Sequence, residues 1–459
     1  MTVFREAGRG PTGMTAISAL TAHWFSLTKK SDMPLRVCIV ALNAYPAIDP
    51  EAAGPIGGIE TRAWTLARGL AQQPDLEVSL IVRNTTSLRS TNFAGVKLIL
   101  WRDRLYSKRE SLALRLQRTS GFPWFQLKMP RWDDLYTIPI LVMERVWRGR
   151  INPLAPLKIC GQVSADIFLT FGVQQISAQV IAAAHATGRK AILLLAHDGD
   201  QYESIQTHPE QVNTVGDSGT MRNWVLTHAD RILCQTPAQF EAVRKLNLSA
   251  TLFRNPIDLE DWSLVSLLPE REVSKPSGYA LWVGRAEREL KQPHKLIEMA
   301  AQCPEIDFLM ILNRRDDAVE EEIRRSAPAN VRIVERIPFH EMPDVFQRAS
   351  VLVNTSSLEG FPNTFLQAAA SGVPIASLNV EATFLEQSAA GWCSKGDLQA
   401  LAKYVRACRE GASAPFNAVR ARQYLEDHHA ASQQTLQLLA LLKETIARDS
   451  QRQNLQPGI

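Results

Sequence analysis

The sequence predicts an α/β protein with two doubly wound domains, each built on a parallel sheet, that face each other across a cleft. Its 459 residues are too many for one ordinary hydrophobic core and suit two domains. Short runs rich in β-branched residues alternate with segments of helical periodicity, which is typical of parallel strands buried on both faces. This alternation begins near residue 35, lapses, and begins again near residue 279, so two sheets are expected.

The first series opens at residues 35–40 with the strand pattern Leu-Arg-Val-Cys-Ile-Val. A loop rich in glycine and proline leads to a helical pattern at 60–73, and a second strand pattern follows at 77–82. Strand, glycine loop, helix and strand form a βαβ unit, which requires a parallel sheet. Later strands of this series are expected at 166–170, 191–195 and 231–234.

The second series opens at residues 279–283, and its later strands are expected at 308–312, 331–334, 351–353 and 374–376. The predicted organisation is, in chain order, a disordered leader at 1–33, a first domain at 34–265, a linker at 266–278, a second domain at 279–412, a helical segment at 413–449 and a tail at 450–459. In the helical segment, Leu436, Leu439 and Leu442 recur at three-residue spacing and are expected to pack back on the body.

Composition excludes several classes of protein. A net charge of +4 over 459 residues does not indicate the concentrated basic face of a nucleic-acid-binding protein. The six cysteines are scattered without a CxxC pair, which argues against a disulfide framework or zinc site and favours a reducing, cytoplasmic compartment. No apolar run reaches the roughly 18–20 residues that a membrane-spanning helix needs.

The sheet pattern lapses between residues 101 and 150. This window holds eleven Lys or Arg against five Asp or Glu, interleaved with Trp101, Trp124, Trp132 and Trp147. Basic, tryptophan-rich surfaces suit an anionic membrane interface, which would place the protein on the inner face of the membrane. The alternative is an insertion whose aromatic side chains pack on the first domain.

The strongest motif lies at residues 357–374, Ser-Leu-Glu-Gly-Phe-Pro-Asn-Thr-Phe-Leu-Gln-Ala-Ala-Ala-Ser-Gly-Val-Pro. It follows a strand pattern and predicts a loop in which Gly360 permits a tight turn, then a helix with Asn363 as N-cap and Gly372 as its end. Free backbone amides at such a helix start favour an anion such as a diphosphate. Glu359 beside that site can accept hydrogen bonds from sugar hydroxyls. Outside such a string it would be an ordinary exposed loop glutamate.

This string resembles the E-x7-E donor motif of the group 1 (family 4) glycosyltransferases, which have the GT-B fold of two Rossmann-like domains and mostly retain anomeric configuration. In that family the first Glu contacts the transferred sugar and the second holds the nucleotide ribose, so the resemblance assigns these roles to Glu359 and to position 367. Position 367 is Gln367, which keeps one acceptor and gains a donor. The resemblance implies donor contacts at Gly360, Phe361, Asn363 and Thr364 as well.

Two cations precede this motif in the same domain. Gly284 and Arg285 end the first strand of the second series, and Lys291 follows six residues later. In the family the matching Arg and Lys neutralise the donor diphosphate. The chemistry agrees, because a leaving nucleoside diphosphate gains negative charge in the transition state and fixed cations stabilise it. Arg also offers a bidentate fork to phosphate oxygens. With both present, no metal ion is expected. Either one alone would be a surface cation.

In the first domain, Gly57 and Gly58 resemble the family's glycine pair between the first strand and helix, where backbone amides approach the donor phosphate or the acceptor. The pair is neither G-x-G-x-x-G nor a P-loop, which argues against a dinucleotide dehydrogenase and an NTPase. The turn at 254–258 also resembles a family segment and is interpreted as structural.

His197 follows the strand at 191–195 and matches a family histidine near the reacting carbon of the sugar, the alternative being a histidine that caps the strand. Asp198 and Asp200 imitate a metal-binding D-x-D, an interpretation disfavoured because Arg285 and Lys291 already supply positive charge.

The resemblance covers about residues 35–100 and 165–407. It implies a metal-independent, hexosyltransferase-like enzyme whose catalytic residues are Glu359, His197, Arg285 and Lys291. The nucleotide-diphosphate-sugar is a substrate, no cofactor is expected, and the acceptor is a glycan or a lipid-linked molecule. The alternative, motivated by Gln367, is a catalytically impaired nucleotide-sugar-binding or scaffold protein on the same fold.

Overall fold

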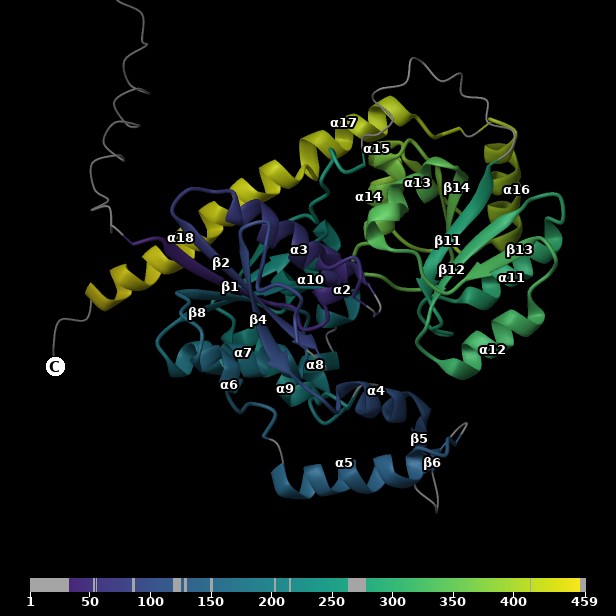
Figure 1. The fold of residues 1–459 in the computed structure, drawn as a ribbon. Coiled ribbons are helices and arrows are strands. Elements are labelled where there is room, and N and C mark those ends of the chain that lie inside the picture. The colour runs from purple at the N-terminus through teal and green to yellow at the C-terminus, as the bar shows by residue number, and fades with distance from the viewer. Residues whose placement is uncertain are drawn as a thin grey trace, which may run out of the picture.

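The computed structural model describes residues 33–52, 54, 56–84, 87–118, 125–127, 130–148, 152–201, 204–213, 216–262, 278–412 and 414–454. Residues 1–32 of the predicted leader, 266–277 of the predicted linker and 455–459 of the predicted tail lie outside these ranges. Two α/β domains, each with its own sheet, stand side by side, and the C-terminal helix runs along the first of them (Figure 1).

The first domain has an eight-stranded sheet in the order β10-β9-β8-β7-β1-β2-β4-β3. All neighbours are parallel except β3 and β4, which form a short antiparallel edge. The strands are β1 (Leu35–Val40), β2 (Leu76–Asn84), β3 (Asn92–Phe93), β4 (Val96–Arg102), β7 (Ile167–Phe171), β8 (Lys190–Leu194), β9 (Arg231–Cys234) and β10 (Ala250–Leu252).

The second domain has a six-stranded parallel sheet in the order β13-β12-β11-β14-β15-β16. Its strands are β11 (Tyr279–Arg285), β12 (Phe308–Asn313), β13 (Val331–Val334), β14 (Ala349–Asn354), β15 (Ile375–Ser377) and β16 (Gly391–Cys393). Numbered within the domain this is the doubly wound order 3-2-1-4-5-6, whose direction of winding reverses between the first and fourth strands. The reversal therefore lies between β11 and β14 here, and between β1 and β7 in the first domain.

Helices cover both faces of each sheet. Those of the first domain are α2 (Tyr45–Ile48), α3 (Gly58–Ala71), α6 (Lys158–Gly161), α7 (Gln175–Ala186), the 3₁₀ helix η1 (Asp198–Gln201), α8 (Ser204–Thr207), α9 (Gly219–His228) and α10 (Pro237–Lys245). Those of the second are α11 (Pro293–Gln302), α12 (Asp317–Ser326), η3 (Phe339–Glu341), α13 (Met342–Gln347), α14 (Asn363–Ala370), α15 (Ala382–Ser388), α16 (Leu398–Arg409) and α17 (Ala418–His428).

Between β4 and α6 the chain leaves the first sheet and forms a separate segment. It contains α4 (Tyr106–Arg115), a hairpin of β5 (Leu116–Arg118) and β6 (Phe125–Leu127), and α5 (Asp134–Arg148). Figure 1 shows α4 below the first domain and α5 projecting farthest from it.

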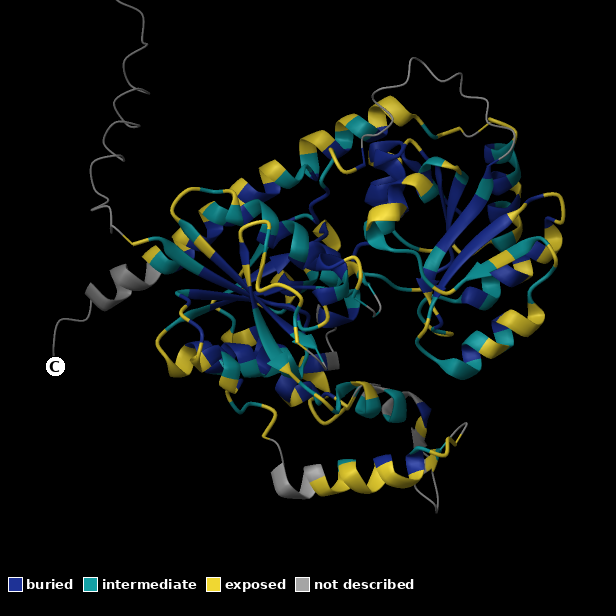
Figure 2. Ribbon diagram, in the orientation of Figure 1, coloured by how far each residue is buried: buried dark blue, intermediate teal, exposed yellow. Residues whose placement is uncertain are grey.

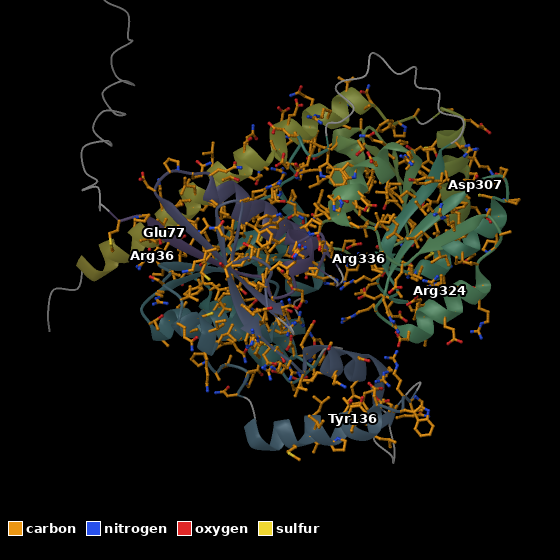
Figure 3. The ribbon with its side chains drawn as sticks, viewed as in Figure 1. Arg36, Glu77, Tyr136, Asp307, Arg324 and Arg336 are labelled. Atoms are coloured by element: carbon orange, nitrogen blue, oxygen red, sulfur yellow. The ribbon has the colours of Figure 1, made fainter. Side chains whose placement is uncertain are left out.

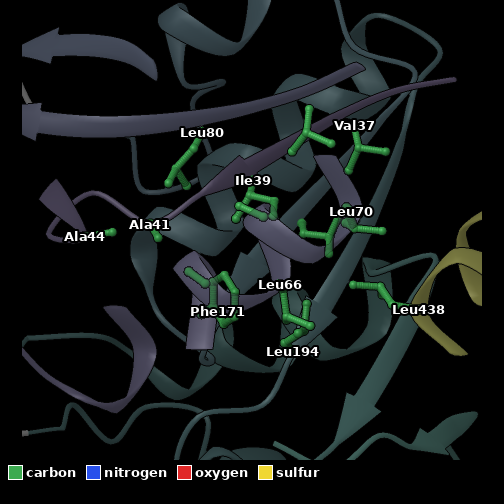
Figure 4. Packing of buried hydrophobic residues seen from close by; sticks show 14 of the residues in the cluster. Val37, Ile39, Ala41, Ala44, Leu66, Leu70, Leu80, Phe171, Leu194 and Leu438 are labelled. Carbon is green, nitrogen blue, oxygen red and sulfur yellow. The ribbon is translucent and has the colours of Figure 1, made fainter. Parts of the chain in front are cut away.

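The last helix, α18 (Ala431–Asn454), belongs to the core of the first domain although it follows the second in sequence. Leu438 and Leu442 are fully buried in the same hydrophobic cluster as Leu66 and Leu70 of α3. Figure 4 shows Leu438 of α18 with Leu66 and Leu70 in this cluster. The predicted register was partly wrong, because Leu436 is 56% exposed while Leu438, which the three-residue spacing omitted, is buried. Helical neighbours on one face lie three and four residues apart. Leu441 and Leu442 follow Leu438 at these two spacings, and all three side chains are buried.

Truncating this contact tests whether α18 stabilises the first domain. We expect Leu438→Ala and Leu442→Ala each to lower the free energy of unfolding by about 2–5 kcal/mol, because each removes a fully buried side chain and leaves a cavity. Leu436→Ala, on the exposed side of the same helix, serves as control and should change it by less than about 0.5 kcal/mol. Chemical denaturation measures all three, and equal effects at the three positions would contradict the packing described.

Candidate active site

The carboxyl ends of both sheets open at their reversal points onto one cleft between the domains, with a volume of about 720 Å³. The second domain contributes the end of β11 and the loop and first turn of α14. The first contributes the glycine pair at the start of α3 and the loop after β8. Arg336 lies between the two domains in Figure 3, and its guanidinium donates to the Ala52 carbonyl across the cleft at 3.0 Å.

Lys291 and Glu359 form an ion pair in the wall of this cleft. Lys291 Nζ donates to Glu359 Oε1, and Ser356 Oγ donates to the same oxygen at 2.7 Å. The Glu359 and Lys291 side chains are only 14% and 19% exposed. Burial opposes ionisation of Glu359, but the Lys291 charge and the hydrogen bonds from Lys291 and Ser356 outweigh it, so the pKa of Glu359 is lowered. Glu359 is therefore a carboxylate at neutral pH.

Arg285 stands beside this pair as the last residue of β11. Because β11 and β14 are neighbouring strands, the chain ends that follow them meet at the same edge of the sheet. Arg285 is 45% exposed, and its Nε lies 3.3 Å from Glu287 Oε1. The Arg285 charge contributes to lowering the pKa of Glu359. At the end of β11 the cleft wall thus places two cations beside an ionised carboxylate, which can bind a diphosphate and hydroxyl groups respectively.

Asn363 does not cap α14, contrary to the sequence prediction. The residue before the helix is Pro362, with no side-chain cap, and Asn363 is the first helical residue. Its Nδ2 donates at 3.0 Å to both the Gly58 carbonyl and Thr61 Oγ1, and its Oδ1 accepts from Asn255 Nδ2 at 2.8 Å. The side chain serves a contact with the first domain instead of its own helix, which a local pattern cannot indicate.

Gly360 is required by a close approach between the domains. Its φ lies outside the left-handed region, so the tight turn predicted from sequence is not the reason for glycine. A Cβ at this position would lie 2.3 Å from the Ala196 carbonyl oxygen of the first domain. Next to it, the Asp198 amide donates to the Glu359 carbonyl at 3.2 Å. The loops after β8 and β14 are therefore in direct contact.

The glycine pair makes room for a carboxylate. A Cβ at Gly57 would lie 2.6 Å from Glu60 Oε2, whereas one at Gly58 would meet Asn363 only at an ordinary 3.6 Å. Burial raises the pKa of Glu60, although hydrogen bonds from its own amide and that of Gly57, and the charge of Arg285, oppose this shift. Glu60 thus folds back over the start of α3, where the sequence prediction expected backbone amides to approach a ligand.

His197 lines the cleft, and its Nδ1 accepts a hydrogen bond from the Gly199 amide at 3.0 Å. The neutral ring consequently carries its proton on Nε2. Asp200 is buried and accepts from the amides of Val173, Ala196 and His197 at 3.1, 2.8 and 3.1 Å. This aspartate shapes the loop that presents His197.

The other aspartate of the D-x-D, Asp198, accepts from Gln239 Nε2 at 2.9 Å. Neither Asp198 nor Asp200 lines the cleft. Within the described ranges, no group of three or more His, Cys, Asp and Glu side chains is arranged to hold a metal ion.

The remaining predicted donor residues line the same cleft: Gly284, Phe361, Thr364 and Gln367. Gln367 is buried on α14. Sequence reasoning did not single out several further lining residues, which are Asn43, Arg83, Gln174, Gln175, Arg315 and Arg336. An isolated polar residue after a strand does not indicate a binding site when only one sequence is considered. Only the reversal points of the two sheets could have indicated them.

Glu381 was also missed, and it forms an acidic group with Asp198 and Glu359. Burial, followed by the charges of Asp198 and Glu359, raises the pKa of Glu381 to about 8. Burial also raises the pKa of Asp198 to about 6, against a hydrogen bond from Gln239. Glu381 precedes α15 in an isolated Val-Glu-Ala context that predicts no role. It joins this group because the loops after β14 and β15 are neighbours in the sheet.

Glu381→Gln should change how stability depends on pH. The pKa of Glu381 is about 8 in the folded protein against a reference value of 4.5, so between these pH values the folded state binds a proton that the unfolded chain has lost. Stability therefore falls as pH rises across this window. We expect the Tm of the wild type to fall more than that of Glu381→Gln between about pH 5 and about pH 8.

Glu386→Gln, at an exposed position on α15, is the matched control and should follow the wild type. Differential scanning fluorimetry across this pH range measures all three proteins. A Tm profile of Glu381→Gln parallel to that of the wild type would contradict the raised pKa of Glu381.

Residues 278–410 match a protein-family model described as glycosyl transferases group 1. The match spans the second domain and contains Arg285, Lys291, Glu359 and Gln367. The resemblance predicted from sequence is confirmed over these residues. No curated protein matches this chain.

Solved structures of similar fold extend over both domains. A sucrose-phosphate synthase from Thermosynechococcus elongatus superposes with a TM-score of 0.61 at 17% identity, covering 90% of this chain and 100% of that one. A variant of S. aureus TarM in complex with fondaparinux, alpha-GlcNAc-glycerol and UDP gives 0.57 at 9% identity, covering 89% and 99%. The lipopolysaccharide outer core galactosyltransferase WaaB gives 0.51 at 14%, covering 89% and 100%. The predicted GT-B fold is confirmed.

Proposed function

We propose that this chain transfers a sugar from a nucleotide-diphosphate-sugar to an acceptor bound across the cleft. The observation that carries the proposal is the cluster of Arg285, Lys291 and Glu359 at the reversal point of the second sheet, within the residues that match the group 1 family. The fold supports a donor of this class, since the similar TarM structure holds UDP. Nothing in this chemistry calls for a cofactor, because the nucleotide-sugar is itself the substrate.

In the proposed mechanism the donor replaces one contact of the ion pair. The Lys291 ammonium group then contacts both Glu359 and the diphosphate. Arg285, which is half exposed beside it, contacts the phosphate oxygens. Glu359 then accepts hydrogen bonds from the hydroxyls of the transferred sugar. As the bond between sugar and phosphate breaks, negative charge grows on the leaving diphosphate, and the two cations stabilise it without a metal ion.

The first domain is proposed to hold the acceptor. Its side of the cleft presents amide side chains, an arginine and an indole, which suit hydroxyl groups and the face of a sugar ring: Asn43, Arg83, Trp101, Gln174 and Gln175. His197, with a proton on Nε2, is placed to donate a hydrogen bond to donor or acceptor.

We propose that the reaction retains the anomeric configuration by attack from the face of the leaving group. The acceptor oxygen bonds to the anomeric carbon as the sugar–phosphate bond breaks, and its proton passes to a phosphate oxygen of the leaving nucleotide. This route needs no enzyme nucleophile. Among the described residues that line the cleft, the carboxyl groups are those of Glu60 and Glu359. Backbone amides at the start of α3 hydrogen-bond to Glu60, and Lys291 hydrogen-bonds to Glu359, so neither is free to act as a nucleophile.

The acceptor class follows from the basic, tryptophan-rich window at 101–150. We propose a glycan or lipid-linked acceptor, and thus a part in polysaccharide or glycolipid synthesis at the inner face of a membrane, with the protein attached peripherally. Among the helices that the structure describes, none has both the length and the apolar character needed to span a bilayer.

Removing either cation tests the donor site. We expect Arg285→Ala and Lys291→Ala each to lose roughly 2–4 kcal/mol of transition-state stabilisation in kcat/KM, because each removes a fixed charge from the leaving group. Lys295→Ala is the control, since Lys295 pairs with Glu298 on α11 outside the cleft. Transfer rates with the true donor are the measurement, and wild-type rates in both cleft variants would defeat the assignment.

Gln367→Glu separates the enzyme from the alternative, a catalytically impaired sugar-nucleotide-binding protein. If position 367 contacts the ribose, a carboxylate should strengthen donor binding by about 1 kcal/mol, because hydrogen bonds to a charged acceptor are the stronger ones. Calorimetric donor titration and an assay of donor hydrolysis compare the two proteins. A wild type that binds the donor without turnover with any acceptor, together with a Gln367→Glu variant that gains hydrolysis, would favour the alternative.

A further inference from the structure

Helix α5 presents an apolar surface to solvent. Residues 135–143 of this helix, Leu-Tyr-Thr-Ile-Pro-Ile-Leu-Val-Met, carry no charge. Figure 2 shows most of the described part of α5 as exposed. We define the α5 face by its exposed apolar side chains, which are Trp132 just before the helix and Leu135, Tyr136, Ile138, Ile140, Val142 and Met143 on it. Trp132 is 90% exposed and Leu135 74%.

The side of α5 that faces the protein is polar, the reverse of an ordinary surface helix. Among the side chains of α5 that the structure describes, Asp134 and Thr137 are the buried ones. Asp134 pairs with both terminal nitrogens of the buried Arg115, at 2.5 and 2.7 Å, and accepts from the Arg131 amide at 2.7 Å. No α5 side chain among those described belongs to any of the four hydrophobic clusters. Polar contacts therefore hold the helix in place with its apolar side outward.

An exposed apolar face of this kind indicates a binding partner, and the charge of the surrounding segment indicates which class of partner it is. Residues 101–150 have an excess of six basic over acidic residues, whereas the whole chain has an excess of four, so the rest of the chain is acidic by two. All of the positive excess thus belongs to the segment that carries the α5 face. Arg131 is exposed beside it, and Lys108 Nζ lies 4.7 Å from the centre of the Tyr136 ring.

This combination favours an anionic lipid surface over a second copy of the chain. Basic residues are attracted to anionic headgroups, and a helix with one apolar side lies in the membrane plane with that side at the headgroup–acyl boundary. Two copies joined through the α5 face would instead bring two basic segments together, and like charges disfavour that contact.

The segment also connects this face with the cleft. Trp101, near the end of β4, and Arg83 line the cleft wall proposed for the acceptor, and the Arg83 guanidinium lies over the ring of Tyr106, the first residue of α4. Arg131 pairs with Asp317 of α12 at 2.9 Å, so the segment also contacts the second domain. A molecule anchored in a bilayer under α5 would meet the acceptor side of the cleft first.

We propose that the α5 face docks the protein on an anionic lipid bilayer, with α5 in the membrane plane, Trp132 at the interface and the acceptor wall turned toward the lipid. The proposal rests on the proposed function in one respect, that the acceptor is lipid-linked. The docking surface itself is independent of the donor site, since no residue of the α5 face lines the cleft.

Co-sedimentation of the full chain with vesicles tests this surface without any donor. We expect binding to vesicles of phosphatidylcholine mixed with phosphatidylglycerol at low salt, with weaker binding at high salt and to pure phosphatidylcholine. The double variant Leu135→Asp with Val142→Asp should lower the partition coefficient at least about tenfold, because it places two charges on the inserted side. Val419→Asp, at an exposed apolar position on α17, is the matched control and should bind as the wild type does.

A wild type that ignores the anionic vesicles, or a double variant that binds them equally well, would overturn the proposal. The proposal would also be overturned if the wild type formed a dimer and did not bind vesicles, and if the double variant were a monomer. The α5 face would then be the contact with a second copy of the chain. Thermal shifts with UDP and GDP in vesicle-free buffer show whether the variants remain folded and keep the donor site. A wild type that shows thermal shifts with UDP or GDP but does not bind vesicles would overturn the docking surface and leave the proposed function standing. Vesicle binding without any nucleotide shift would support it and count against the proposed function.

Discussion

The ion pair between Lys291 and Glu359 is the interaction on which the cleft depends. Both side chains are mostly buried, and burial alone would favour a neutral Glu359. Each charge therefore stabilises the other, and removing one would leave the other uncompensated in a poorly solvated site. The pair keeps a carboxylate and an ammonium group ready at the reversal point of the second sheet. A nucleotide-sugar carries hydroxyls at one end and phosphates next to them, so Glu359 can bind the hydroxyls while Lys291 binds the phosphates.

Three of the contacts between the domains are made by the loop that carries Glu359. The carbonyl of Glu359 accepts from the Asp198 amide, Gly360 lies against Ala196, and Asn363 reaches Gly58. Glu359, which contacts the transferred sugar in the proposed mechanism, thus belongs to the segment that joins the domains. Any opening of the cleft must break these hydrogen bonds, so donor binding and domain position are physically coupled. The half-buried residues Glu381 and Asp198, whose carboxyl pKa values are raised, lie close to this junction.

Local patterns predicted what local physics determines. The alternation of strands and helices predicted both sheets, although it omitted the strands β3, β4, β10 and β16. The run from Glu359 to Gly372 predicted a loop and a helix where they are found. The predictions failed where a side chain serves the other domain. Asn363 has the residue type of an N-cap but bonds across the cleft, and Gly360 is glycine because of Ala196, about 160 residues earlier in the chain. Glu381 and the exposed face of α5 depend on tertiary neighbours, which periodicity does not contain.

The central claim is that one cationic pocket in the second domain holds a pyrophosphate while an acidic side chain steadies the attached hexose. A crystal structure of the protein soaked with UDP- or GDP-hexose tests it most directly. The account predicts the diphosphate between Arg285 and Lys291, with Glu359 accepting hydrogen bonds from the hexose hydroxyls. A closed pocket, or a bound nucleotide whose phosphates leave both cations directed to bulk solvent, would contradict it.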